Sequence, residues 1–274
     1  TGEIALGNYR KRIQVRGHDE LSELARNMNI MAESVESNVR ALEDVAEDRK
    51  HFIDNLSHEM KTPLTSILGF SDLLQIKKDI TDESRIEYAG IIKEEASRMR
   101  TLSGKLMELI TVGEAKLEFH KEDMGSLFHE IGISLKVVAD SHKMHLSCEA
   151  EEGELCVDRE LFKSLLYNLV DNAIKYTPDG SRITIKSYKD NGNAVIEVSD
   201  NGPGIPDESK DRIFQMFYTT GHKSADGKRG MGLGLPLCRA ILNAHKGTIE
   251  VLDNTPSGST FRLILPAEEV SFHE

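Results

Sequence analysis

The sequence predicts two kinds of structure in one chain: a helical hairpin that pairs with a second copy into a four-helix bundle, then a two-layer α/β sandwich of α+β type. Apolar residues in the first hundred or so positions alternate at spacings of three and four. From about Glu114 onwards, strand-like stretches mix with helical ones. The chain has 274 residues, 39% hydrophobic and 29% charged, which is enough for about two globular units.

The first helical pattern has heptad spacing, which is typical of a helix that packs lengthwise against another helix. Its apolar positions are Leu21, Leu24, Met28, Met31, Val35, Leu42, Val45 and Phe52. Beyond Phe52 the stripe drifts to Met60, Leu64 and Ile67, which indicates a local shift in coiled-coil phase. Pro63 falls inside this pattern and predicts a kink.

A polar turn from Lys77 to Asp82 separates this helix from a second one. The apolar positions of the second helix are Ala89, Ile92, Ala96, Met99, Leu106 and Ile110. Two such helices predict an antiparallel hairpin. Because one hairpin alone leaves its apolar stripe in water, we expect a homodimer.

The later part of the chain predicts a sheet interrupted by helices. The expected strands cover residues 183–188, 194–199, 248–252 and 260–265, and the expected helices cover 124–139, 158–176 and 234–244. The turn Asp190-Asn191-Gly192 predicts a hairpin between the first two strands.

Charge and composition exclude several classes of protein. The net charge of −12 argues against binding to nucleic acid or to an anionic membrane surface. No apolar run approaches the roughly 18 residues that a transmembrane helix needs, and no signal peptide is present. The chain begins at Thr1 without a Met, so we expect it to be part of a longer protein.

His58 is distinguished from the other histidines by its position on the first helix. It falls nearly opposite the apolar stripe that runs from Phe52 to Leu74, and Thr62 follows on the same outer face. Glu59 places a carboxylate beside the imidazole, which can hold one ring nitrogen protonated while the other attacks. A merely solvated surface histidine fits the helical wheel equally well.

Three further clusters suit a phosphorylated ligand, although each is weak alone. Asn168, Asn172 and Lys175 share one helix face, where amide oxygens and an ammonium suit hydrated Mg²⁺ and polyphosphate. Spacing alone favours a polar solvent-facing stripe. The stretch from Asp200 to Pro206 is a glycine-rich turn after a strand. The stretch from Gly230 to Leu235 opens a helix with glycine amides, which suit a phosphate.

The segment from Phe52 to Leu64 closely resembles the H-box of histidine kinases. This resemblance implies that His58 accepts the γ-phosphoryl group of ATP and passes it to an aspartate on the receiver domain of a response regulator. It also implies that Glu59 acts as the base and that Thr62 helps position water for regulator dephosphorylation.

The other clusters, in this order, resemble the N-box, the first glycine box, the F-box (Phe214 and Phe217) and the second glycine box of the ATP-binding fold that histidine kinases share with gyrases. The resemblance implies that Asn172 and Asn168 hold Mg²⁺, that Asp200 accepts a hydrogen bond from the adenine amino group, and that residues 221–230 form a lid. The implied ATP-binding residues are Asn168, Asn172, Lys175, Tyr176, Asp200, Gly202, Gly204, Ile205, Arg229, Gly230, Gly232, Leu233, Gly234, Leu235 and Thr260, the last as a support for Asp200.

The residues from about Asn8 to Val35, including Asn29, resemble the connector and second helix of a HAMP domain. This implies the cytoplasmic portion of an inner-membrane or plasma-membrane sensor, attached to the membrane only through a missing N-terminal segment; a solitary coiled-coil stalk is the alternative. We expect a partial HAMP domain at 1–37, a dimerisation and phosphotransfer hairpin at 38–113, a linker at 114–122 and a catalytic ATP-binding domain at 123–268.

Two other functions fit part of the pattern. A clamp ATPase of the same ATP-binding fold, acting on proteins or DNA, is disfavoured by the H-box and by the acidic charge. A catalytically inactive dimeric scaffold is disfavoured because all the expected polar residues are present.

Overall fold

The computed structural model describes residues 11–15, 17, 19–77, 79–114, 117–221 and 230–266. The chain divides into two compact units, residues 1–62 and residues 63–274. Most of the expected lid, including Lys223, Lys228 and Arg229, lies outside the described residues, and so does the start of the expected HAMP connector.

The first unit is built on the N-terminal part of helix α2 (Glu20–Ile76). Asp19 caps this helix, because its side chain accepts a hydrogen bond from the backbone N–H of Ser22 at 3.0 Å. The side-chain amide of Asn29 donates to the carbonyl of Ile13 at 2.9 Å and accepts from the N–H of Ile13 at 2.8 Å. Asn29 therefore holds the segment around Ile13 against α2 through both backbone polar groups of Ile13.

Helix α2 carries the predicted apolar stripe and continues through Pro63 without interruption. Its large apolar side chains are exposed to solvent in the single chain: Leu21, Leu24, Ile30, Met31, Leu42, Val45, Ile53, Met60, Leu64, Leu68, Leu73 and Ile76. Exposure of so many apolar side chains on one element is typical of a surface that associates with another molecule.

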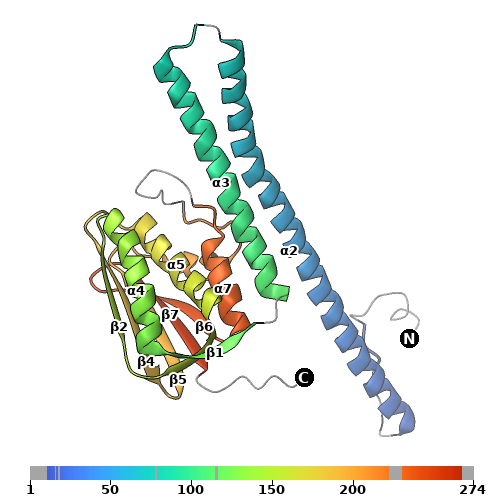
Figure 1. Ribbon diagram of the computed structural model, residues 1–274. Coiled ribbons are helices and arrows are strands. Elements are labelled where there is room, and N and C mark those ends of the chain that lie inside the picture. The colour runs from blue at the N-terminus through green and yellow to red at the C-terminus, as the bar shows by residue number, and fades with distance from the viewer. Residues whose placement is uncertain are drawn as a thin grey trace. The chain divides into compact units, whose positions relative to one another are not determined.

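The second unit starts with the last turns of α2, from which the chain returns as α3 (Asp82–Glu114), so the predicted hairpin turn is present. The rings of Phe70 and Tyr88 lie 5.3 Å apart between their centroids and join the two helices near the turn. Figure 1 shows α3 running antiparallel to these last turns of α2.

The rest of the second unit is the predicted two-layer α/β domain. Its elements are β1 (Phe119–Asp123), α4 (Met124–Ser141), β2 (His145–Ala150), β3 (Glu154–Asp158), α5 (Arg159–Tyr176), β4 (Arg182–Asp190), β5 (Asn193–Asp200), α6 (Asp207–Lys210), η1 (Arg212–Phe214), α7 (Gly234–Ala244), β6 (Thr248–Asp253) and β7 (Ser259–Pro266). The main sheet has the order β2-β4-β5-β7-β6, in which only β2 and β4 are parallel. Strands β1 and β3 form a separate antiparallel pair.

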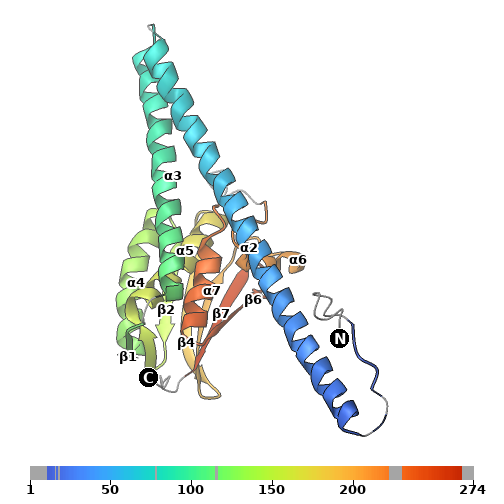
Figure 2. The same cartoon turned by 90° about the vertical axis from the view of Figure 1, so that its right-hand side faces the viewer.

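Helices α4, α5 and α7 cover one face of the main sheet, as the two perpendicular views show (Figures 1 and 2). Their inward side chains fill the core together with those of the sheet, and the rings of Phe128 in α4 and Phe162 in α5 meet edge to face with centroids 5.9 Å apart. All four predicted strands and all three predicted helices are found here. Strands β1, β2 and β3 and the short helices are not among these predicted elements.

His245, which directly follows α7, ties that helix to the start of α5. Its Nε2 accepts a hydrogen bond from the backbone N–H of Asp158 at 3.0 Å, so Nδ1 carries the ring proton and donates to the carbonyl of Ile241 at 2.7 Å. Asp158 in turn caps α5 by accepting from the N–H of Leu161. Burial lowers the pKa of His245 below its ordinary 6.5.

Within the described residues, no helix is both long enough and apolar enough to cross a membrane.

The buried His245 predicts a loss of stability in mild acid. A histidine with a lowered folded pKa binds more protons when unfolded, so its contribution to stability is full above pH 6.5 and falls as the pH drops below that value. The slope from one group cannot exceed about 1.4 kcal/mol per pH unit. Urea unfolding between about pH 7.5 and about pH 5.5 should show a smaller pH effect in His245→Gln than in the wild type.

His129→Gln is the matched control, because His129 is exposed on α4. Its urea midpoint should depend on pH as in the wild type. Equal slopes for His245→Gln and the wild type would contradict the role given to His245.

Candidate functional site

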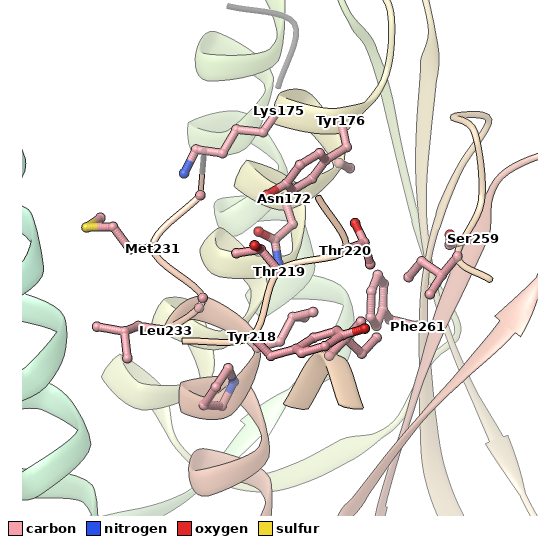
Figure 3. Close-up of a pocket in the computed structure, with 18 of the residues that line it drawn as sticks. Asn172, Lys175, Tyr176, Tyr218, Thr219, Thr220, Met231, Leu233, Ser259 and Phe261 are labelled. Atoms are coloured by element: carbon pink, nitrogen blue, oxygen red, sulfur yellow. The ribbon is translucent and has the colours of Figure 1, made fainter. Parts of the chain in front are cut away.

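The second unit contains a pocket lined by α5, by the turn after β5, by residues 218–220, by the start of α7 and by β7 (Figure 3). Of the residues singled out in the sequence, eleven lie in its lining: Asn172, Lys175, Tyr176, Asp200, Gly204, Ile205, Gly230, Gly232, Leu233, Gly234 and Leu235. Segments far apart in the sequence therefore meet at one site.

The last turns of α5 supply the polar groups at one end of the pocket. Asn172, Lys175 and Tyr176 are three and four residues apart, so they share one edge of the helix. Lys175 is half-buried and its amine lies 2.5 Å from the carboxylate of Asp171. In Figure 3 Lys175 lies at one end of the pocket, and Ser259 and Phe261 of β7 lie at the other.

Asn168, the other predicted metal ligand, is buried and does not line the pocket. Its amide nitrogen donates to the carbonyl of Ser164 at 2.9 Å, and its amide oxygen accepts from the amine of Lys105 at 2.6 Å. Lys105 comes from α3 and lines the pocket itself. The hydroxyl of Ser164, on α5, also donates to the carboxylate of Glu108, on α3.

Lys105 is not among the residues that the sequence motifs predict. Burial is the main cause that lowers the pKa of its amine, and the charge of nearby Lys175 lowers it further. Among the described residues, no carboxylate forms an ion pair with it. A second cation at this end of the pocket would therefore face an unfavourable interaction with Lys105.

Asp200 ends β5 and places its carboxylate at the other end of the pocket. Its Oδ1 accepts hydrogen bonds from the backbone N–H of Gly202 at 2.8 Å and of Ser259 at 3.3 Å. Burial raises the pKa of Asp200, and these two N–H donors oppose that rise. The side chain is a fixed hydrogen-bond acceptor in a largely apolar surrounding.

The backbone of Asp200 is held by two residues that were not predicted. Asn254 donates its side-chain amide to the carbonyl of Asp200 at 2.7 Å. Gly258 has a φ of +115°, and a Cβ at this position would lie 2.0 Å from the same carbonyl oxygen. Only glycine fits there.

Thr260 was expected to support Asp200, and the described hydrogen bonds place it differently. Its hydroxyl is paired with that of Ser199 at 2.8 Å, and the donors to the carboxylate of Asp200 come from Gly202 and Ser259. Like Asn168, Thr260 and Gly202 are not part of the pocket lining.

The predicted F-box and second glycine box meet through their backbones. The N–H of Phe217 donates to the carbonyl of Gly232 at 2.8 Å. Both residues have positive φ, +64° in each case, and a Cβ on Gly232 would lie 2.6 Å from the carbonyl carbon of Phe217. Gly232 is therefore required for the two segments to approach each other.

Tyr218 follows Phe217 and lies along one side of the pocket (Figure 3), although no sequence motif predicts it. Its hydroxyl is 3.0 Å from that of Ser209, and the guanidinium of Arg212 lies 4.5 Å from its ring centroid. These contacts fix the ring in place.

His58 lies on α2 in the first unit and its side chain is exposed, as the helical wheel predicts. The hydroxyl of Thr62, one turn further along, donates to the carbonyl of His58 at 3.4 Å. Glu59 is partly buried. His58 and the pocket therefore belong to different compact units of the chain.

Three stretches of the chain match family models. Residues 1–37 match the HAMP domain, residues 48–113 match the His Kinase A (phospho-acceptor) domain, and residues 157–269 match the histidine kinase-, DNA gyrase B-, and HSP90-like ATPase. His58 lies in the second match, and the pocket residues of α5, β5, α7 and β7 lie in the third.

Curated relatives align with nearly the whole chain. The chain is 30% identical over 269 residues to the sensor-like histidine kinase SenX3 of Mycobacterium tuberculosis strain H37Rv, covering 97% of this chain and 65% of that protein. It is 28% identical over 270 residues to the sensor histidine kinase YclK of Bacillus subtilis, covering 97% of this chain and 57% of that protein. The chain thus spans less than two thirds of the length of either relative.

Solved structures show the same fold. Acinetobacter baumannii histidine kinase AdeS matches with a TM-score of 0.62 at 25% identity, over 77% of this chain and 98% of that chain. Histidine kinase ThkA in complex with response regulator protein TrrA matches with a TM-score of 0.65 at 26% identity, over 83% of this chain and 66% of that chain.

The fold and the paired sites define a protein with a phospho-acceptor helical hairpin and a separate ATPase-like domain. The chain belongs to the sensor histidine kinases of two-component systems.

The close approach of Gly258 to Asp200 predicts that Gly258→Ala destabilises the domain and weakens ATP binding. Any alanine at positive φ costs about 1–2 kcal/mol, and here the added methyl also pushes against the backbone that carries the Asp200 carboxylate. Thermal unfolding and titration with a fluorescent ATP analogue measure the two effects.

Gly192→Ala is the control, because Gly192 also has positive φ, +79°, but open space around its Cα. It should lose stability without a change in ATP affinity. Equal effects of the two variants on ATP affinity would show that the contact with Asp200 does not matter.

Proposed function

We propose that this chain transfers the γ-phosphoryl group of ATP to His58 and then donates it to an aspartate on the receiver domain of a response regulator. One observation carries the proposal: an exposed histidine in a phospho-acceptor match and a pocket in an ATPase match occur in one chain. Regulator dephosphorylation, with Thr62 helping to position water, belongs to the same proposal.

The nucleotide orientation follows from the chemistry of the two pocket ends. Asp200 is a buried acceptor at one end, suited to the amino group of adenine, which guanine lacks at that position. Lys175 and the glycine amides at the start of α7 suit the phosphates at the other end. The polar residues of α5 lie at the phosphate end, so a nucleotide would span the pocket from base to phosphate.

Mg²⁺ fits the donors at the phosphate end. This ion prefers oxygen ligands and keeps waters and substrate phosphates in its coordination shell, so it needs few protein groups. Asn172, in the lining, and Asn168, whose amide oxygen accepts from Lys105, would hold the ion through their amide oxygens. When bound, the ion neutralises charge on the phosphates.

In the phosphotransfer step, the lone pair of one His58 ring nitrogen forms a bond to the γ-phosphorus while the bond to the bridging oxygen breaks and ADP leaves. The proton on the other ring nitrogen passes to Glu59. Lys175 and the backbone N–H groups at the start of α7 stabilise negative charge that builds up on the transferring group and on ADP.

We further propose that the chain works as a homodimer and as the cytoplasmic portion of a membrane sensor. A second copy would cover the apolar face of α2, where Leu64 and Leu68 are exposed one turn apart. The HAMP match at residues 1–37 supports the link to a sensor.

His58→Gln should abolish labelling of the protein by ATP that is radiolabelled in its γ-phosphate, because the side chain that accepts the phosphoryl group is removed. Binding of a fluorescent ATP analogue should be unchanged, since the pocket lies in the other unit. His51→Gln is the matched control: His51 is exposed on the same helix and pairs with Glu47 at 3.7 Å, so its removal should leave labelling intact. Full labelling of His58→Gln would refute the assignment of the acceptor.

Lys105→Met should lower the Mg²⁺ concentration needed for ATP binding. The Lys105 amine occupies the Asn168 oxygen and adds positive charge where the metal would bind. Removing one such hydrogen bond should shift the Mg²⁺ midpoint by roughly two- to tenfold.

The affinity for an ATP analogue, titrated against Mg²⁺, measures this shift. Lys136→Met, on the exposed side of α4, controls for the loss of one positive charge. A higher Mg²⁺ requirement in Lys105→Met would mean that Lys105 binds phosphate instead of competing with the metal.

A further inference from the structure

The start of α7 lies beside a cation from α3 and both predicted metal ligands of α5. A Cβ built on Gly234 would lie 3.4 Å from Oδ1 of Asn168 and 3.5 Å from Nζ of Lys105. The side-chain nitrogen of Asn172 lies 3.9 Å from the same point. Since Mg²⁺ binds oxygen at about 2.1 Å, an ion on the Asn168 oxygen would lie within about 5 Å of the ammonium that donates to it at 2.6 Å. The ammonium and a metal ion would therefore compete for one acceptor.

A second polar contact between α3 and α5 lies outside the pocket. Glu108, about one turn after Lys105, accepts a hydrogen bond from the hydroxyl of Ser164. The carbonyl of Ser164 in turn accepts from the side-chain nitrogen of Asn168 at 2.9 Å. Neither Glu108 nor Ser164 is part of the pocket lining. A change at Glu108 would thus act on a nucleotide through the docking of α3, without direct contact.

The apolar contacts of α3 with the ATPase-like domain lie beyond these polar ones. Val112 is 5% exposed and belongs to the core of that domain, and Leu109 packs against the same core. Both residues are close to Glu114, where α3 ends and the chain continues toward β1. A tilt of α3 about Val112 would separate Lys105 from Asn168 and leave the apolar contacts in place. The polar contacts can therefore open without exposure of the core.

We propose that the two polar contacts, Lys105 with Asn168 and Glu108 with Ser164, form a latch that opposes the binding of Mg·ATP. With the latch closed, the Lys105 ammonium takes the oxygen that the metal needs, so only the open form binds Mg·ATP fully. The opposition is reciprocal, because a ligand that binds the open form also opens the latch. This inference rests on the proposed role of Asn168 as a metal ligand. It makes Glu108 a regulatory residue of a pocket that it does not line.

Glu108→Ala tests the proposal, because it removes the acceptor of the outer contact and leaves the pocket lining unchanged. The affinity for a fluorescent ATP analogue in Mg²⁺ should rise by roughly two- to tenfold, since a larger fraction of the protein is open. In EDTA, where no metal competes with Lys105, the affinity for the same analogue should not rise. Glu87→Ala, which changes an exposed carboxylate on the same helix, should leave both affinities at the wild-type values.

Hydrogen exchange reports on the latch without any phosphoryl transfer. Addition of a non-hydrolysable Mg·ATP analogue should speed exchange of the backbone amides at residues 105–110 in the wild type, because that part of α3 loses its contacts with α5. Direct protection by a ligand would have the opposite sign. In Glu108→Ala the faster exchange should be present before the analogue is added.

Asn168→Ala separates this inference from the proposed function. That variant should lose the gain in ATP affinity that Mg²⁺ provides, and a normal gain would overturn the metal role of Asn168 itself. If Asn168→Ala loses the gain but Glu108→Ala binds Mg·ATP with wild-type affinity, the latch does not oppose the nucleotide and the inference is wrong. An equal rise of affinity in EDTA, or slower exchange at residues 105–110 on addition of the analogue, would also overturn it.

Discussion

The packing of α5 against the sheet is the constraint on which the site depends. One side of this helix buries Leu165, Leu166, Leu169 and Val170 completely or nearly so. Each fully buried side chain of this size contributes roughly 1.5–3 kcal/mol, so the rotation of the helix about its axis is fixed. The edge beside this buried face then has to carry Asn172, Lys175 and Tyr176 into the pocket. No other interaction is needed to orient the polar residues of the N-box toward the pocket.

The two ends of α5 are fixed by different interactions. At the start, Asp158 caps the helix and is itself held by His245 from the end of α7. The two helices that supply opposite parts of the pocket are thereby joined at their far ends. At the other end, Thr177 is the C-cap residue of α5, and its side chain packs against Gly202 in the turn after β5. The contacts that hold α5 in place therefore also fix the position of the pocket residues that it carries.

Periodic sequence patterns predicted the elements that contain them and missed those that depend on contacts with distant parts of the chain. Helical periodicity located α4, α5 and α7, and apolar alternation located β4 to β7. Strand β1, with the sequence FHKED, carries too little apolar alternation to be recognised. The parallel pairing of β2 with β4 joins segments separated by an entire helix, and no local signal encodes it. Within the described residues the fold class needed only local signals, and the order of the strands did not follow from them.

The same division holds for the pocket. Motifs that contain glycine or amide side chains were recognisable, and eleven of the residues they contributed lie in the lining. Lys105, Asn254 and Ser259 act through contacts with residues far away in the sequence, so nothing beside them marks their role. Thr260 shows the opposite case. The sequence resemblance predicts that Thr260 supports Asp200, whereas its hydroxyl is paired with Ser199, and backbone N–H groups donate to the carboxylate.

The contact of Lys105 with Asn168 relates the hairpin to the nucleotide chemistry. An amide oxygen that accepts from a lysine at 2.6 Å cannot also bind a divalent cation without bringing two positive charges within a few ångströms of each other. On the proposed nucleotide orientation, occupation of the phosphate end by metal and nucleotide would therefore disfavour the contact with α3. His58 and the pocket lie in separate units, and we propose that the ATPase-like domain comes to His58 for the transfer. On the proposed metal-binding role of Asn168, loading of the nucleotide would weaken an interaction that joins the ATPase-like domain to the second helix of the hairpin.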